Sequence, residues 1–458
     1  MNTSKPHEID FLKSALEKES EVNSVDFILD WLRRKNDQVR TVVEQVPLDK
    51  LDKWSFDPQT GNIVHQSGRF FSIEGIRVET NWGKVPFWEQ PIINQPEIGY
   101  LGILTKKIGG ILHFLMQAKI EPGNINLVQL SPTLQATKSN YTRVHKGKVP
   151  LYIEYFNGEK AADILIDQLQ SEQGARFLRK RNRNIIMEVP ESEDLPEYDN
   201  FIWLTLGQLK KLISHDNIVN MDARTVVSGI QYGKVNDHLL NPLLKGDSSL
   251  NDFDDIISWI TKLKSKYELN VKLIPLKSVA NWGYDGLAYN HHEGKYFSVI
   301  GVRVEIDDRE VVSWDQPMIR PAQEGLVAFI VKEIKGVYHF LVQAKVEAGN
   351  FDILELAPTV QCLTGNYRKG YNEYSVPFIN DVLSASKEQI WYSARQSEEG
   401  GRFYMEQNLN MIIEAKNDFS VEVPENYCWA TLNQLLTFIR FNNYLNIEAR
   451  SLLSAVII

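Results

Sequence analysis

The sequence predicts an α+β fold built from two consecutive copies of one domain. Three observations support this prediction. Whole motifs recur at a constant spacing of 226 residues, short runs alternate apolar and polar side chains as strands do, and other runs repeat apolar residues at helical spacing. Solenoids and propellers have periods of roughly 20–50 residues, so the longer period indicates that a complete domain is duplicated.

The repeat is clearest in three motifs. WEQPII begins at Trp88 and returns as WDQPMI at Trp314, and 314 − 88 = 226. HFLMQAKIEPGN and LSPTLQATKSNY return at the same spacing as HFLVQAKVEAGN and LAPTVQCLTGNY. The first copy aligns with the second without a gap over about residues 71–228. We therefore divide the chain into an N-terminal repeat with leading helices, residues 1–240, and a C-terminal repeat, residues 241–458.

Each copy is expected to begin with a helix, over residues 25–34 and 253–264, because apolar residues recur there at helical spacing. A β-rich middle follows, in which Gly109-Gly110 predicts a hairpin turn. We then expect a helix over residues 161–181, a strand in NIIMEV and a last helix over residues 206–214. Short turns between strands favour antiparallel neighbours, which is typical of the α+β class.

Composition and charge argue against several classes of protein. The 458 residues are 43% hydrophobic, and 50 Lys and Arg against 59 Asp and Glu give a net charge of −9. An acidic surface argues against binding to nucleic acid or to an anionic membrane. Two cysteines cannot form a disulfide framework, so we expect a cytoplasmic protein. The absence of an apolar run of about 18 residues argues against a membrane-spanning helix.

One predicted strand, from His113 to Glu121, has a polar face. Side chains alternate across a strand, so Phe114 and Met116 belong to a core face, and Gln117 and Lys119 share the opposite face with both ends of the run. The second copy repeats the polar face without a change. A solvated Lys–Glu surface is the alternative interpretation. Identity between two diverged copies favours a face that lines a pocket.

Two further motifs supply candidate ligands for a sugar nucleotide. The loop PTLQATKSNY offers neutral donors and acceptors suited to sugar hydroxyls, although turn chemistry explains such residues equally well. WxQP offers a ring for stacking or for core packing. The candidate substrate-binding residues are Trp88, Gln90, His113, Gln117, Asn124, Thr133, Gln135, Asn140, Arg176, Trp314, Gln316, His339, Gln343, Asn350, Thr359, Gln361, Asn366 and Arg402.

Arginines that match between the copies are natural ligands for a diphosphate, because guanidinium groups fit phosphate oxygens. We expect one of three pairs to contact phosphate, namely Arg77 and Arg303, Arg176 and Arg402, or Arg224 and Arg450. The motifs GxGxxG, GxxxxGK[ST], HExxH and GxSxG are absent. We therefore expect no cofactor and no metal.

The motifs WEQPII, HFLMQAKIEPGN and LSPTLQATKSNY, with their second copies, closely resemble the NDP-hexose 2,3-dehydratase family over essentially the whole chain. The resemblance implies two tandem Nudix-like domains with mixed sheets, a homodimer, and a nucleoside-diphosphate-sugar pocket in each half, of which one performs chemistry. The chain lacks the Nudix box, whose glutamates hold Mg²⁺. That departure fits a lyase built on the fold.

The resemblance also implies the reaction. The C4 ketone of a dTDP-4-keto-6-deoxyhexose acidifies the hydrogen on C3, a base removes it, and the C2 hydroxyl leaves as water. Tautomerisation then gives a 3,4-diketo-2,6-dideoxy sugar. The candidate catalytic residues are Lys119, Glu121, Tyr141, Lys345, Glu347 and Tyr367, with either glutamate as the base. Lys138 and Pro122, which the second copy lacks, favour the N-terminal half as the catalytic one.

Two alternatives belong to other classes of protein. A metal-dependent nucleotide-sugar pyrophosphohydrolase would require a cluster of metal-binding carboxylates, and the sequence shows none. A non-catalytic protein could instead bind a nucleotide sugar in its duplicated pockets.

Overall fold

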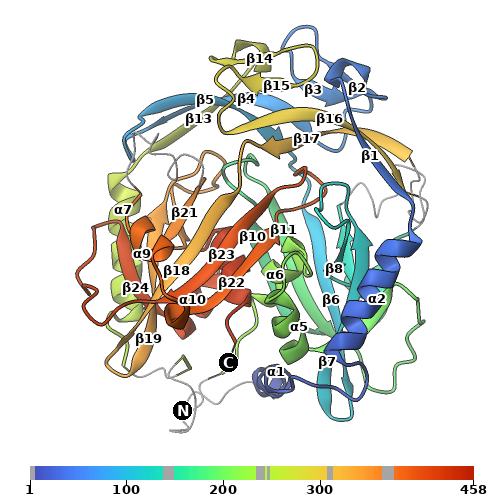
Figure 1. The fold of residues 1–458 in the computed structure, drawn as a ribbon, viewed down its shortest axis with the longest axis vertical. Coiled ribbons are helices and arrows are strands. Elements are labelled where there is room, and N and C mark those ends of the chain that lie inside the picture. Colours follow the sequence, from blue (N-terminus) through green and yellow to red (C-terminus); the bar gives the residue numbers. More distant parts are fainter. Residues whose placement is uncertain are drawn as a thin grey trace.

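The computed structural model describes residues 6–137, 149–233, 243–244, 248–306, 313–363 and 376–457 (Figure 1). The first half contains α1 (Pro6–Leu16), α2 (Val25–Gln38), β1 (Thr41–Val46), η1 (Leu48–Lys50), β2 (Trp54–Phe56), β3 (Ile63–His65), β4 (Ser72–Thr80), β5 (Phe87–Asn94), β6 (Gly99–Ile108), β7 (Ile111–Ile120), β8 (Val128–Ser131), β9 (Leu134–Ala136), α4 (Ile153–Phe156), β10 (Asp163–Ser171), β11 (Arg181–Glu188), β12 (Phe201–Thr205), α5 (Leu206–Ile213) and α6 (Met221–Val227).

The second half repeats this order. It contains α7 (Phe253–Lys266), β13 (Leu269–Ile274), η2 (Leu276–Ser278), β14 (Trp282–Tyr284), β15 (Tyr289–His291), β16 (Phe297–Ile306), β17 (Ser313–Pro321), β18 (Gly325–Ile334), β19 (Val337–Lys345), β20 (Glu355–Ala357), β21 (Val360–Leu363), α9 (Ile379–Leu383), η3 (Lys387–Gln389), β22 (Ile390–Ser397), β23 (Gln407–Glu414), β24 (Tyr427–Thr431), α10 (Leu432–Ile439) and α11 (Ile447–Ser454). Two similar halves of mixed α and β structure confirm the predicted α+β class and the duplication.

Each half contributes one large sheet, and the two sheets have the same strand order. The first runs β10-β11-β6-β7-β12, with β8 beside β7 and β9 beside β6. The second runs β22-β23-β18-β19, and β20 and β24 both pair with β19. Neighbours are antiparallel except for β6 with β11 and β18 with β23. The polar strand face of the sequence therefore lies on β7, inside the first sheet, and on β19, inside the second.

The two smaller sheets exchange strands between the halves. β13 of the second half pairs with β4 of the first, with Leu269 opposite Thr80. β1 of the first half pairs with β16 of the second, with Thr41 opposite Ile306. Figure 1 shows these sheets together above the two large ones. The first strand of each half is thus built into the other half, so the halves are interlocked.

The predicted terminal helices of each half are present, because local capping and apolar spacing agree. Ser24 caps α2 by accepting a hydrogen bond from the backbone N–H of Phe27. Thr205 and Gln208 form a capping box at the start of α5. The described residues contain no helix with the length and apolar character needed to cross a membrane.

The helix expected over residues 161–181 is wrong. Residues 163–171 form β10, which pairs antiparallel with β11. Leucines and isoleucines spaced three and four apart resembled a helical stripe, but the pairing with β11 overrides that local preference. The hairpin at Gly109-Gly110 is confirmed, and both glycines adopt positive φ (61° and 79°), as a tight two-residue turn requires.

All three arginine pairs have structural partners, but these partners differ in kind. Arg77 and Arg303 each lie 2.8 Å from a carboxylate of the neighbouring strand, of Glu89 and Asp315 respectively. Arg224 and Arg450 are buried between the halves. Arg224 Nη1 donates to Ser451 Oγ at 2.7 Å, and Arg450 Nε donates to Thr225 Oγ1 at 3.1 Å. These two pairs hold strands and halves together. The guanidinium groups of Arg176 and Arg402 lie 4.3 and 4.1 Å from the ring centres of Phe297 and Phe71, and Arg402 Nε also donates to Gln95 Oε1 at 3.3 Å.

Candidate active site

A cavity of about 760 Å³ lies between the first large sheet and a segment of the second half. Its walls come from β7 and the residues after it, from β9, from Asp222 on α6, and from residues 399–402 of the other half. Strand β17 of the second half adds Trp314 and Gln316. Both halves therefore build this one site.

Eight of the predicted site residues line the cavity: Gln117, Lys119, Glu121, Thr133, Gln135, Trp314, Gln316 and Arg402. They come from motifs far apart in the sequence. Trp314 Nε1 donates to Gln316 Oε1 at 3.0 Å, and Gln316 Nε2 donates to the carbonyl of Gly401 at 2.7 Å. The WxQP motif of the second copy thus serves the cavity built on the strand of the first copy.

The other predicted residues lie elsewhere. His113 is buried, its Nδ1 is 2.8 Å from the Ile111 carbonyl, and its Nε2 is 2.9 Å from Ser20 Oγ. The remaining described candidates outside the cavity wall are Trp88, Gln90, Asn124, Arg176, His339, Gln343, Lys345, Glu347, Asn350, Thr359 and Gln361. Asn140, Tyr141, Asn366 and Tyr367 lie outside the described residues.

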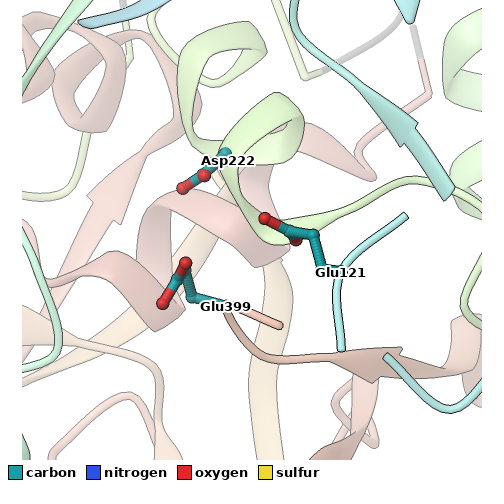
Figure 2. A group of neighbouring side chains, drawn as sticks. All are labelled: Glu121, Asp222 and Glu399. Atoms are coloured by element: carbon teal, nitrogen blue, oxygen red, sulfur yellow. The ribbon is translucent and has the colours of Figure 1, made fainter. Parts of the chain in front are cut away.

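Three carboxylates meet at the cavity wall (Figure 2). Glu121 follows β7, Asp222 lies on α6, and Glu399 follows β22 of the second half. One oxygen atom from each lies within 4.8 Å of the others. Sequence reasoning found only Glu121 and expected no carboxylate cluster, so the structure corrects that expectation. One signal existed: Glu399 replaces the Gln173 of the first copy within otherwise similar motifs, QSEEGGRF and QSEQGARF.

Glu121 is held by a chain of hydrogen bonds. Gln135 Nε2 donates to Glu121 Oε1 at 2.7 Å. The Gln135 amide is oriented because its Oε1 accepts from Ser131 Oγ at 2.9 Å and from Asn220 Nδ2 at 3.2 Å. Lys119 Nζ donates to the Gln135 carbonyl at 3.2 Å. Hydrogen bonds to Gln135 therefore hold both the Glu121 carboxylate and the Lys119 ammonium in place.

Docking of the Gly123-Asn124 turn on the other half brings Glu399 to Glu121. The Gly123 N–H donates to the Gly400 carbonyl at 2.8 Å, and the Met405 N–H donates to the Gly123 carbonyl at 2.7 Å. A Cβ atom at position 123 would lie 1.7 Å from the carbonyl oxygen of Phe403. Only glycine permits this approach. The second copy uses Gly349 against the first half in the same manner.

Burial and neighbouring charge change the acidity of the cluster. Burial, and then the charges of Glu172, Glu399 and Glu121, raise the pKa of Asp222 well above its ordinary value. Burial raises the pKa of Glu399 to about 7, against the opposing effect of Arg402 and together with the charge of Glu121. Near neutral pH these effects favour the protonated form of Asp222 and leave Glu399 divided between its protonated and ionised forms.

The equivalent place in the second half differs in its charges. Gln361 Nε2 donates to Glu347 Oε1 at 3.0 Å, as Gln135 does to Glu121. Glu448 stands where the first half has Asp222, and 448 − 222 = 226. Gln173 of the first half lies here in place of Glu399 and donates to Glu398.

The sequence model of the NDP-hexose 2,3-dehydratase family matches residues 26–230 and again residues 253–456. The chain belongs to this family. Three relatives are named dTDP-4-dehydro-6-deoxy-alpha-D-glucopyranose 2,3-dehydratase. One from Saccharopolyspora spinosa is 46% identical over 93% of this chain and 90% of the relative. One from Amycolatopsis orientalis is 43% identical over 93% and 88%. One from Streptomyces violaceoruber is 44% identical over 93% and 95%.

Proposed function

We propose that the cavity is the active site of a sugar-nucleotide 2,3-dehydratase that acts on dTDP-4-dehydro-6-deoxyglucose, the sugar nucleotide in the names of the three relatives. Membership of the family makes the chain a carbon–oxygen lyase of deoxysugar biosynthesis. The observation that carries the proposal is the meeting of Glu121, Asp222 and Glu399 in a cavity of about 760 Å³. Cavities of about 300–1,000 Å³ are typical of sites for small molecules of this class.

Glu121 is proposed as the base. The C4 ketone makes the hydrogen on C3 acidic, and removal of that proton gives an enediolate. Glu121 suits this step because two hydrogen-bonded groups, Gln135 and Lys119, fix the carboxylate and its surroundings. A base in a fixed position contributes roughly 10²–10⁴ to a rate.

Glu399 is proposed as the acid that protonates the departing C2 hydroxyl. Its pKa of about 7 keeps a large share of the carboxyl protonated at neutral pH, so that it can donate a proton there. Asp222, whose pKa is also raised, can share the proton with Glu399.

The N-terminal half is proposed as the catalytic one, in agreement with the preference from the sequence. Glu399 supports it, because the corresponding position of the other site is Gln173, which cannot donate a carboxylic proton. We propose that Trp314, Gln316 and Arg402 contact the nucleotide, and that the corresponding residues of the second copy form a binding site without chemistry. Tyr141 remains a proposed stabiliser of the enediolate.

The test is incubation of the purified protein with dTDP-4-dehydro-6-deoxyglucose, with and without EDTA, followed by NMR and mass analysis of the product. Loss of one water to a 3,4-diketo sugar with the diphosphate intact supports the proposal. Metal-dependent release of dTMP and sugar phosphate would contradict it and indicate a pyrophosphohydrolase whose metal ligands are the three carboxylates. Binding without turnover would indicate a nucleotide-sugar-binding protein.

We also propose, from the family resemblance, that residues 1–240 and 241–458 are two Nudix-like units and that the enzyme is a cytoplasmic homodimer. Repetition of the strand order in both large sheets supports the duplicated unit. Size-exclusion chromatography with light scattering measures the molar mass and so tests the dimer. A monomer at micromolar concentration would contradict it. Comparison of either large sheet with a Nudix domain tests the fold assignment.

A further inference from the structure

We propose that Lys180 is a catalytic residue of the N-terminal site and stabilises the negative charge that develops on the C4 oxygen of the substrate. This inference rests on the proposed function and adds a residue that sequence reasoning did not select. Lys180 lines the same cavity as the three carboxylates and is only 5% exposed.

The internal duplication supplies the first argument. The position that corresponds to Lys180 in the second half is Glu406, and 406 − 180 = 226. The polar residues on either side are kept, since Glu172 corresponds to Glu398 and Asn182 to Asn408, whereas residues 178–181 change from LRKR to YMEQ. Asn182 donates to Glu172 at 2.7 Å, and Asn408 donates to Glu398 in the same way. Between two preserved Asn–Glu hydrogen bonds the charge at this position is reversed, and this reversal favours a difference in chemistry between the two sites.

The backbone fixes the lysine at the wall. The carbonyl of Lys180 accepts a hydrogen bond from the Glu172 N–H at 2.9 Å, and the preceding Arg179 donates its N–H to the Gly349 carbonyl at 2.8 Å. Arg179 adopts a left-handed conformation, with φ of 48°. The ammonium donates to the carbonyl of Glu97. A cation placed in advance costs little reorganisation when charge develops on a substrate oxygen.

Chemistry supplies the second argument. Proton removal from C3 converts a neutral ketone into an enediolate, and the nearby carboxylates make the cavity a poor place for a further negative charge. The charged groups with the largest effect on Lys180 among the described residues are Glu172, Arg402, Glu399 and Glu97. Burial lowers the pKa of Lys180 to about 8, while Glu172 raises it. The ammonium is therefore present at neutral pH and is lost as the pH rises above about 8.

The test compares Lys180→Met and Lys180→Arg with Lys210→Met. Lys210 is a matched control, because it is also a buried lysine but lies outside the cavity wall, where its ammonium donates to the Ser454 and Val456 carbonyls at 3.1 and 2.6 Å. Three quantities are measured: kcat, the Kd for dTDP, and exchange of the C3 hydrogen with deuterated water, which reports enediolate formation alone. Lys180→Met should lower kcat and the exchange rate by roughly a hundredfold. The Kd for dTDP should change by less than about threefold, and Lys210→Met should retain kcat.

The pH dependence of exchange in the unaltered protein is independent of how the variants fold. The exchange rate should fall as Lys180 loses its proton above about pH 8, and in Lys180→Arg the fall should move beyond pH ~10. A constant exchange rate above pH 8, or kcat of Lys180→Met within about tenfold of the unaltered enzyme, would overturn the inference. A weaker Kd for dTDP with kcat retained would make Lys180 a diphosphate ligand and also overturn it. Absence of turnover by the unaltered protein would instead refute the proposed function.

Discussion

Glu121 and Glu347 occupy matching places in the two halves, yet different charges surround them. Each glutamate accepts a hydrogen bond from a glutamine amide, at 2.7 Å from Gln135 and at 3.0 Å from Gln361. Each is followed by a Gly-Asn turn that docks against the other half. The scaffolds of the two sites are therefore alike.

Two of the differences change the charge at the sites. The N-terminal site has the carboxyl of Glu399 and the ammonium of Lys180, whereas the other site has the amide of Gln173 and the carboxyl of Glu406. Burial raises the pKa of Glu406 to about 7, with Arg176 acting in the opposite direction. One site thus combines an acid with a cation, and the other has an acid without that cation. A duplicated scaffold can be preserved by packing while a few charges decide which copy performs chemistry.

The largest expected effect comes from removing the base and its cation from one half at a time. Lys119→Ala with Glu121→Gln should lower kcat by at least roughly 10²–10⁴, because a positioned base is lost. Lys345→Ala with Glu347→Gln should change kcat far less. The measurement is kcat with dTDP-4-dehydro-6-deoxyglucose, and circular dichroism verifies folding of both proteins.

Two outcomes of this comparison would contradict the prediction. If only the second set abolishes turnover, the catalytic half has been assigned incorrectly. If neither set lowers kcat by tenfold in a folded protein, the polar face of β7 (Ile111–Ile120) is not where the chemistry takes place.

A smaller effect is expected when the acid alone is removed. Glu399→Gln gives the N-terminal site the amide that the other site has in Gln173, and kcat should fall roughly a hundredfold. In the unaltered enzyme the raised pKa of Glu399, about 7, means that the acid is protonated below that pH. Elimination should therefore decline as the pH rises through about 7, and this decline should be absent from Glu399→Gln. An unchanged pH profile in the variant would assign the acid to another group.

The sequence predicted those parts of the site that lie within continuous motifs. Lys119 and Glu121 were found because strand alternation places them on one face, and Gln135 because its motif is repeated. Asp222 and Glu399 were not found, since they reach the cavity only through the packing of α6 (Met221–Val227) and of the other half. Proximity of this kind depends on non-local contacts, which local patterns do not encode.

The same reason explains two features that the sequence did not reveal. Strand exchange between the halves depends on which sheet edge β1 (Thr41–Val46) and β13 (Leu269–Ile274) meet, and alternation alone says nothing about a partner. Likewise, His113 belongs to the polar face by alternation, but at the far end of β7 it contacts Ser20 and the Ile111 carbonyl. The role of His113 therefore depends on its position along the strand as well as on the face of the sheet to which it belongs.

The two docking glycines, Gly123 and Gly349, should contribute about equally to stability, although the two sites differ in chemistry. Gly123→Ala and Gly349→Ala each place a Cβ 1.7 Å from a carbonyl oxygen of the other half. Both should lower the free energy of unfolding by about 1–3 kcal/mol or more, because backbone must move to relieve the overlap. Chemical denaturation of both variants and of the unaltered protein measures the free energy of unfolding. A large loss in one variant and none in the other would show that the two docking contacts are not equivalent in energy.

The smallest effect is expected from removal of metal ions. Glu121, Asp222 and Glu399 have the composition of a divalent-cation site, but each ligand must lose its proton before it binds a metal. The raised pKa values of Asp222 and Glu399 oppose that loss near neutral pH, and Lys119 and Arg402 already supply positive charge to the cluster. Dialysis against EDTA should therefore leave kcat within about twofold.

Addition of Mg²⁺ or Mn²⁺ should likewise leave kcat within about twofold. The comparison is best made at pH 7 and at about pH 9, because protons compete less with a cation at the higher pH. Glu399→Gln serves as the matched control, since it removes one of the three ligands without altering the other two. Loss of turnover on dialysis, with recovery on adding Mg²⁺ to the unaltered protein and none in Glu399→Gln, would make the three carboxylates a metal site. The acid and base roles given to Glu399 and Glu121 would then have to be abandoned. The two halves would differ instead in that one site binds a cation and the other does not.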